Sequence, residues 1–294
     1  MSRNVALVLS SVGARGIAHI GVIEELEKAG FKITSVAGTS MGSVVGAMFA
    51  LGKLEEYKQW LLQVTKMDII KFLDLTIEHG GLVKGEKIVQ VMAGFVGNVN
   101  IEDLPIPYTA VAVDIRRHEE VVFTTGNLMK AIRASISIPT VFLPVSQDHS
   151  FLVDGGVLNP LPLDVVKRQP GDILVSVNVN SPEKFNPAHD EVISTAHQQG
   201  YLNARERLNE KWSKLVNRGN KEVKLKSKEI GMFDLISESI NLMQHRMSIH
   251  AIEKYNPDIT INISAKVATI FDFYRAEALI EIGRQACRKA LSEQ

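Results

Sequence analysis

The sequence has a single cysteine, no excess of either charge and no long apolar run, and each scarcity excludes a class of protein. Cys287 alone forms neither an internal disulfide nor a cysteine-rich metal site, which fits a reducing compartment. Lys+Arg and Asp+Glu both number 33, so no global charge attracts the chain to nucleic acid. The longest nearly apolar stretch, Val44 to Leu51, is far shorter than the ~20 residues that span a bilayer. We therefore expect a soluble, cytoplasmic protein that binds no nucleic acid.

The composition is otherwise that of an ordinary globular protein. With 45% apolar and 22% charged residues, the 294-residue chain has enough apolar side chains for a sizeable core, and α/β folds of this length are commonly single domains. The apolar run Val5–Leu9 is too short for the core of a signal peptide and is predicted as a buried first strand. We expect one α/β domain over residues 1–294.

The strongest local pattern surrounds Ser40. A short apolar strand is followed by Gly38-Thr39-Ser40-Met41-Gly42 and then by a run of small residues typical of a close-packed helix. Glycines two residues either side of the serine relieve the crowding of a sharp strand-to-helix turn, which leaves the hydroxyl exposed at the positive end of the helix. The functional interpretation is a nucleophile. The structural alternative is a tight turn whose serine caps the helix.

A second small-residue loop, Ser10–Gly16, lies earlier in the chain, between the first strand and a helix that ends before Gly30. Exposed amides at a helix start favour negative charge, so the functional interpretation is an oxyanion hole for acyl transfer. The loop by itself favours a simple strand-to-helix turn. Because Val5–Leu9 and Phe31–Ala37 are predicted as parallel neighbours, the loop and the Ser40 turn would open on the same edge of the sheet.

Asp154 is the other residue that stands out, because it ends the predicted strand Ser150–Val153 and precedes Gly155 and Gly156. An aspartate with an ordinary pKa of about 4 is a poor base in water. To accept the proton of Ser40 it must be partly desolvated and within hydrogen-bond reach, about 2.6–3.2 Å. Asp-Gly turns are frequent, so this residue alone favours a structural turn.

The last third of the chain contains a basic segment and an amphipathic one. From residue 203 to 229, nine Lys or Arg face four acidic residues, which indicates either a solvated helical insertion, the interpretation that composition favours, or a face for anionic lipid head groups. Apolar residues then recur at steps of three and four, as in a helix that packs on the body: Ile236, Ile240, Met243 and Met247. We expect a basic helical insertion at about 200–255 that packs on the core, with peripheral contact at the inner membrane face as its open alternative.

Taken together, four blocks resemble the bacterial patatin-like phospholipases in their order along the chain. The blocks are Gly13–Val22, Gly38–Gly42, Ala134–Val145 and Val153–Pro162. The segment Phe271–Glu277 also resembles the closing helix of that family, so the likeness spans almost the whole chain. The resemblance implies a patatin-like three-layer α/β/α fold with a mostly parallel central sheet.

The resemblance also implies a mechanism. Ser40 would be the nucleophile and Asp154 the base of a serine lipid acyl hydrolase of phospholipase A, lysophospholipase or carboxylesterase type, working through an acyl-enzyme without histidine, metal or cofactor. The other positions that it implies are Val12 and Gly13 for the oxyanion hole, Arg15 and Gly16 for support of that loop, Gly38 and Gly42 for the Ser40 turn, and Gly155 and Gly156 for the Asp154 turn. The partner implied is a lipid or acyl-ester substrate; the oligomeric state is left open.

One block departs from the family pattern. The family loop carries several consecutive glycines, whereas this chain has Ser10, Ser11, Val12 and Gly13. A valine at positive φ is a conformational outlier. Either Val12 stays extended and the oxyanion hole is kept, or the hole is distorted and turnover falls by about a hundred- to a thousandfold. We expect an active hydrolase whose turnover depends on this loop.

Two other interpretations remain open. A Ser-His-Asp hydrolase would complete its triad with His245 or His250, although Ser40 lies very early for that fold. A patatin-like scaffold with a degraded glycine loop would instead bind lipid or regulate a partner without catalysis. The retained Ser40 and Asp154 argue against this second alternative, because a scaffold needs neither.

Overall fold

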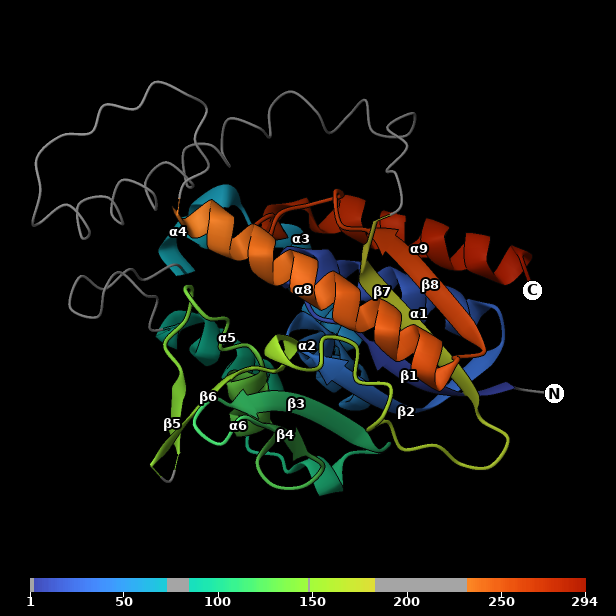
Figure 1. Cartoon of the computed structure of the whole chain (residues 1–294). Coiled ribbons are helices and arrows are strands. Elements are labelled where there is room, and N and C mark those ends of the chain that lie inside the picture. Colours follow the sequence, from blue (N-terminus) through green and yellow to red (C-terminus); the bar gives the residue numbers. More distant parts are fainter. Residues whose placement is uncertain (1–2, 73–84, 148, 183–231) are drawn as a thin grey trace, which may run out of the picture.

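The structure, a computed structural model, describes residues 3–72, 85–147, 149–182 and 232–294 (Figure 1). Its strands are β1 (Arg3–Leu9), β2 (Phe31–Thr39), β3 (Tyr108–Asp114), β4 (Glu119–Phe123), β5 (Val145–Gln147), β6 (Ser150–Asp154), β7 (Ile173–Ser181) and β8 (Ile259–Ser264). Its helices are α1 (Ala18–Lys28), α2 (Met41–Ala50), α3 (Leu54–Gln63), α4 (Lys66–Phe72), α5 (Glu86–Val96), α6 (Leu128–Ser135), α8 (Met232–Tyr255) and α9 (Ala276–Ser292). Short 3-10 turns are η1 (Gly13–Ile17), η2 (Ile101–Asp103), η3 (Gly155–Val157) and η5 (Phe273–Arg275).

The strands form one sheet in the order β5-β6-β3-β2-β1-β7-β8, and β4 also pairs with β3. The run β3-β2-β1-β7-β8 is parallel throughout, whereas β4, β5 and β6 pair antiparallel. The predicted parallel pairing of the first two strands is confirmed. The carboxyl ends of the parallel strands therefore share one edge, which is where sites occur in open α/β sheets.

The register of β3 explains how two distant segments meet. β4 occupies one edge of β3 along Ala110–Asp114, so β2 and β6 must share the opposite edge. On that edge, the last residue of β2, Thr39, pairs with Val111, and the last residue of β6, Asp154, pairs with Ala112. Since β2 runs parallel and β6 antiparallel to β3, their carboxyl ends point at each other. The turn after Thr39 and the carboxylate of Asp154 are thus brought together by backbone pairing alone.

Helices cover both faces of the sheet, as the resemblance implied. Along β1, Val5, Leu7 and Leu9 join the larger core, which includes residues of α1, α2 and α9. The alternate residues Ala6 and Val8 join a smaller cluster on which α8 packs. Figure 1 shows α8 crossing one face of the sheet, with α1 and α9 packed together on the other. The first strand is therefore buried as predicted, with successive residues facing opposite cores of the three-layer fold.

Two predicted elements differ in the structure. The apolar residues of Phe142–Val145 predict a short strand, but β5 begins only at Val145. α8 does pack on β7, yet its predicted inward residue Met243 is 55% exposed and Gln244 beside it is buried. The basic stretch of residues 203–229 lies outside the described residues. In the described part of the chain, no helix has the length and apolarity to cross a membrane.

Candidate active site

The Ser40 turn is closed by two glycines and by backbone hydrogen bonds. Ser40 itself adopts φ 55° and ψ −125° between β2 and α2. A Cβ on Gly38 would lie within 3.0 Å of the Gly42 carbonyl, and one on Gly42 within 3.0 Å of the Leu9 carbonyl. The Ser40 carbonyl accepts a hydrogen bond from the amide of Ser43 at 2.9 Å. The predicted need for glycine at both flanking positions therefore has a steric cause: three backbone segments touch here.

The end of α6 holds the two key residues in place. The amide of Ser40 donates to Oγ of Ser135 at 2.9 Å, and the amide of Asp154 donates to the carbonyl of Ser137 at 3.0 Å. Asp154 Oδ1 accepts a hydrogen bond from the amide of Gly156 at 2.8 Å, which is the hydrogen bond of an Asp-Gly-Gly turn. A single loop after α6 thus fixes both strand ends.

Asp154 is buried, at 4% exposure, and burial raises its pKa to about 7. The adjacent Ser40 hydroxyl and the Gly156 amide act in the opposite direction and favour the ionised carboxylate. Oδ2 of Asp154 has no partner of good hydrogen-bond geometry among the described residues, Ser40 included. Catalytic hydrogen bonds often tighten only when substrate binds. The carboxyl meets one condition expected of a base for Ser40, because it is desolvated, and it lies next to the Ser40 hydroxyl.

The loop after β1 presents two unused amides. Its neighbours are tied down, because the amide of Ser11 donates to Pro160 O at 2.8 Å and that of Ala14 to Ile270 O at 3.2 Å. The amides of Val12 and Gly13, by contrast, make no hydrogen bond with any described residue. Both residues line a cavity together with Ser40. These two backbone amides are therefore available as hydrogen-bond donors beside Ser40.

The conformation of Val12 differs from the extended alternative considered above. Its φ is 147° and its ψ 97°, and Gly13 follows at φ 43°. A Cβ at Gly13 would lie 2.7 Å from the Cα of Ile270, so only glycine fits there. The loop therefore follows a glycine-type path through Val12, at the cost of backbone strain.

Arg15 and Gly16 support the loop from behind. Arg15 is 3% exposed, and its guanidinium donates to Ala265 O at 2.6 Å and to Asn241 Oδ1 at 3.2 Å. Burial lowers the pKa of Arg15 to about 10. A Cβ at Gly16 would collide with the side chain of Met41, the residue after Ser40. Arg15 thus links the loop to α8 and to the end of β8.

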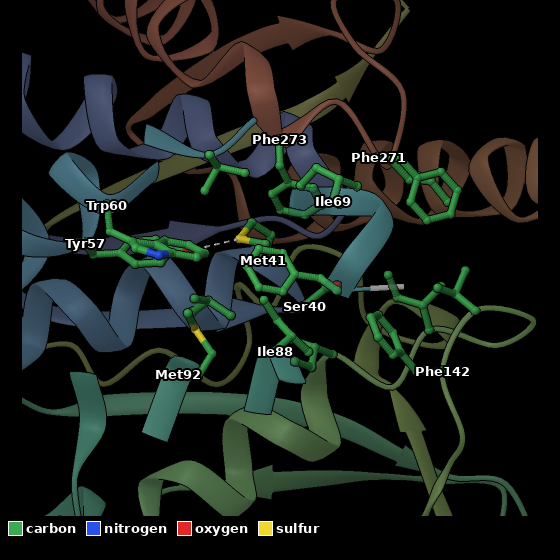
Figure 2. Close-up of a pocket in the computed structure, with 18 residues that line it drawn as sticks. Ser40, Met41, Tyr57, Trp60, Ile69, Ile88, Met92, Phe142, Phe271 and Phe273 are labelled. Atoms are coloured by element: carbon green, nitrogen blue, oxygen red, sulfur yellow. Dashed lines mark hydrogen bonds between the residues drawn. The ribbon is translucent and has the colours of Figure 1, made fainter. Parts of the chain in front are cut away.

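An apolar cavity opens beside Ser40 and encloses about 870 Å³ of space free of atoms, part of it open to solvent. Figure 2 shows Tyr57 and Trp60 at one end of this cavity, Phe142 and Phe271 at the other, and Ser40 between them. The walls come from α3, α5, the segment before β5 and the segment before α9. Sequence reasoning missed these wall residues, because aromatic residues at helical spacing have the same pattern in a core and in a wall.

A smaller, more polar cavity lies on the Asp154 side of Ser40. Its lining includes Ser11, Asp154 and two polar residues of α8, Asn241 and Gln244. Gln244 is 7% exposed and had no sequence signal, because the apolar periodicity placed its neighbour Met243 inward. The serine and its carboxyl neighbour thus stand between an apolar compartment and a polar one.

Three histidines near the sheet or on α8, which a triad could use, lie away from Ser40. Nδ1 of His245 lies 2.8 Å from Asn180 O, and His250 is exposed on α8. Nε2 of the buried His19 lies 2.9 Å from Ser10 O, and burial lowers the pKa of this histidine to about 4. None of the three is among the residues lining the two cavities at Ser40. The geometry gives a Ser-His-Asp triad no support.

Comparison with known proteins places the chain in a family. Residues 7–167 match the sequence profile of the family described as patatin-like phospholipase. An uncharacterized NTE family protein of Mycobacterium tuberculosis is 34% identical over 99% of this chain and 92% of its own length. The neuropathy target esterase sws of Drosophila melanogaster is 30% identical over 61% of this chain, which covers 13% of that protein. The crystal structure of VipD from Legionella pneumophila has the same fold, with a TM-score of 0.50 at 16% identity, over 99% of this chain and 67% of its own. The chain belongs to the patatin-like phospholipase family, and within it to the NTE family, whose members are lipid hydrolases.

Proposed function

We propose that the protein is a serine lipid acyl hydrolase in which Ser40 attacks the ester carbonyl and Asp154 accepts the serine proton. One observation supports this most strongly. Ser40 directly follows the last residue of β2 and Asp154 is the last residue of β6, and these two strand ends meet head to head on β3. Both residues are buried and line the polar cavity, and Ser40 also lines the apolar one. Family membership supports the general class of reaction, and the geometry supports the assignment of roles.

The reaction follows from the position of each group. Ser40 Oγ bonds to the acyl carbon while its proton passes to Asp154, and the carbonyl oxygen gains negative charge. The free amides of Val12 and Gly13 are placed to donate to that oxygen, and the N-terminus of α2 adds a favourable dipole. Collapse of the intermediate breaks the ester bond, and the leaving alcohol takes the proton from Asp154. An acyl group remains on Ser40, and water releases it as the acid.

The apolar cavity is the place for the acyl chain. Its described lining is almost entirely aliphatic, aromatic or methionine side chains, contributed in part by Tyr57, Met92 and Phe273. A cavity of this kind binds hydrocarbon by removing apolar surface from water, at roughly 25 cal/mol per Å². The polar cavity on the other side of Ser40 would hold the alcohol part of the ester. This division favours a long-chain acyl ester, such as a phospholipid or lysophospholipid, over a short polar ester.

Reaction with a fluorophosphonate probe tests this assignment directly. Such probes label a serine only when its hydroxyl is activated. We expect labelling of the wild type and its loss in both Ser40→Ala and Asp154→Asn. The matched control is the double variant His245→Ala/His250→Ala, which should label like the wild type. Loss of labelling in that control would restore the triad alternative. An unlabelled wild type would contradict the proposal and favour a lipid-binding or regulatory protein.

A further inference from the structure

Three buried polar atoms around the Asp154 turn lack a hydrogen-bond partner among the described residues. They are Oγ of Ser11, Oδ2 of Asp154 and Oε1 of Gln244. Their side chains are 1%, 4% and 7% exposed, so bulk water does not satisfy them. Leaving such an atom unpaired costs about 1–3 kcal/mol each. The three residues line the same cavity beside Ser40, so their unpaired atoms point to a ligand held in that cavity.

The three side chains converge on the same glycine. A Cβ placed on Gly156 would lie 2.5 Å from Gln244 Nε2, 2.9 Å from Ser11 Oγ and 3.1 Å from Asp154 Oδ1. All three residues line the polar cavity that also includes Ser40. The cavity offers about 40 Å³ to water centres, more than the ~10–15 Å³ that a single water needs. A water held by two to four polar groups is the usual occupant of such a space.

Gln244 is held in position from both sides along α8. Asn241, three residues before it, accepts a hydrogen bond from the buried guanidinium of Arg15. His245, the next residue, lies 2.8 Å from the carbonyl of Asn180 at the end of β7. These contacts fix α8 against the loop after β1 and against the sheet. These contacts of α8 therefore hold the side-chain amide of Gln244 in the cavity that Asp154 also lines.

We propose that Gln244, with Ser11, holds the water that hydrolyses the acyl-enzyme. This proposal rests on the Ser40–Asp154 chemistry above and assigns the second half of that reaction. The water donates one hydrogen to Oδ2 of Asp154 and the other to Oε1 of Gln244, which leaves a lone pair for the acyl carbon. As the water oxygen bonds to that carbon, its proton passes to Asp154. Collapse breaks the bond between the acyl carbon and Ser40 Oγ, and Ser40 recovers its proton from Asp154.

Formation and hydrolysis of the acyl-enzyme can be measured separately, and a residue that only positions the hydrolytic water should affect the second step alone. Gln244→Met keeps the length of the side chain and removes the acceptor oxygen, and Met243→Gln is the matched control on the exposed side of α8. With a p-nitrophenyl ester of a fatty acid, Gln244→Met should release its first equivalent of nitrophenol as fast as the wild type. Its later turnovers should be about tenfold to a hundredfold slower, because the water is no longer aligned. Intact mass measurement should then show the acylated protein accumulating, and Met243→Gln should behave like the wild type.

A second variant guards against misfolding. Gln244→Glu keeps an acceptor oxygen at the same distance along the side chain, so it should recover most of the deacylation rate at alkaline pH, where the neighbouring Asp154 is ionised. Thermal unfolding of each variant checks its fold. Unchanged deacylation in Gln244→Met, or no recovery in Gln244→Glu, would overturn the role. A slower first equivalent with unchanged later turnovers would also overturn it, since Gln244 would then serve the alcohol part of the ester, which the same cavity receives, and not the water. A wild type that never becomes acylated would instead refute the Ser40–Asp154 chemistry itself, and this proposal with it.

Discussion

Two turns at the carboxyl edge of the sheet each hold a residue other than glycine at positive φ, and they differ in what that conformation achieves. Ser40, at φ 55°, is flanked by Gly38 and Gly42, and its strained backbone presents the hydroxyl next to Asp154. Val12, at φ 147°, precedes a glycine that already accepts positive φ, and its side chain is only packed, at 6% exposure. In the proposed reaction the amide of Val12 is used and its side chain is not. In the proposed reaction, strain at Ser40 therefore positions the nucleophile, whereas strain at Val12 comes only from having valine where the backbone favours glycine.

The largest effect is expected where the Ser40 turn meets the loop. Gly42→Ala places a Cβ within 3.0 Å of the carbonyls of Leu9 and Ser10, and backbone atoms cannot move aside cheaply. We expect a loss of about 4 kcal/mol or more in the free energy of unfolding, measured by denaturant titration. The control is Gly94→Ala on α5, where nothing lies within 4 Å and a helix gains roughly 0.5–1 kcal/mol. Similar stabilities for the two variants would show that the turn is not closed by these contacts.

The second largest effect is expected at Asp154, whose burial destabilises the ionised carboxylate that the proposed reaction uses as its base. The native pKa of Asp154, about 7, lies above its unfolded value of about 3.9, so the native state holds the proton more tightly. Its contribution to stability is complete below about pH 4 and is lost as the pH rises through 7, by about 4 kcal/mol at most. Asp154→Asn keeps the acceptor for the Gly156 amide and carries no charge. It should be inactive yet more stable than the wild type above pH 7.

The pH series supplies the control for that variant. The difference in unfolding free energy between Asp154→Asn and the wild type should shrink as the pH falls from 7 toward 4 and then stay constant. Hydrolysis by the wild type should increase as the pH is raised through about 7, because the base must be ionised. A constant stability difference across all pH values would mean that the carboxylate is solvated in the native state. The Ser40 side of the site would then carry no electrostatic cost of the kind proposed here.

Short-range patterns made the sheet and the two turns predictable. The Ser40 turn, the Asp154 turn and the parallel pairing of β1 with β2 each depend on a few consecutive residues, and the structure places all of them as expected. Their catalytic roles stay predictions. On α8 the predicted inward face is wrong at one residue, because Met243 is exposed and Gln244 is buried. The other predicted residues of that face are half-buried: Ile236, Ile240 and Met247. Gln244 lines a polar cavity, which the apolar periodicity of its helix does not reveal.

Long-range features were not predictable in the same way. Trp60 packs against the main core, as its helical spacing predicts, but it also lines a cavity together with Phe142 and Phe273, which lie far along the chain. The φ of Val12 is set by neighbours that its own residue type does not specify, since Ser11 is tied to Pro160 and Ala14 to Ile270. The sequence therefore predicted candidate residues for the site. It could not predict their neighbours, because these belong to segments that meet only in the folded chain.

The smallest expected effect tests the Val12 turn itself. Both Val12→Ala and Val12→Gly lose buried methyl groups, but only glycine relieves the positive φ, which costs about 1–3 kcal/mol for other residues. We therefore expect the glycine variant to be more stable than the alanine variant by about 1 kcal/mol, the reverse of the usual order. The same pair at Val8, inside β1, should follow the usual order and serves as the control. Because the loop already follows a path that glycine accepts, Val12→Gly should also retain wild-type turnover. An alanine variant as stable as the glycine variant would show that Val12 is not strained, and a large gain in turnover with glycine would show that its side chain, not its backbone, disturbs the oxyanion donors.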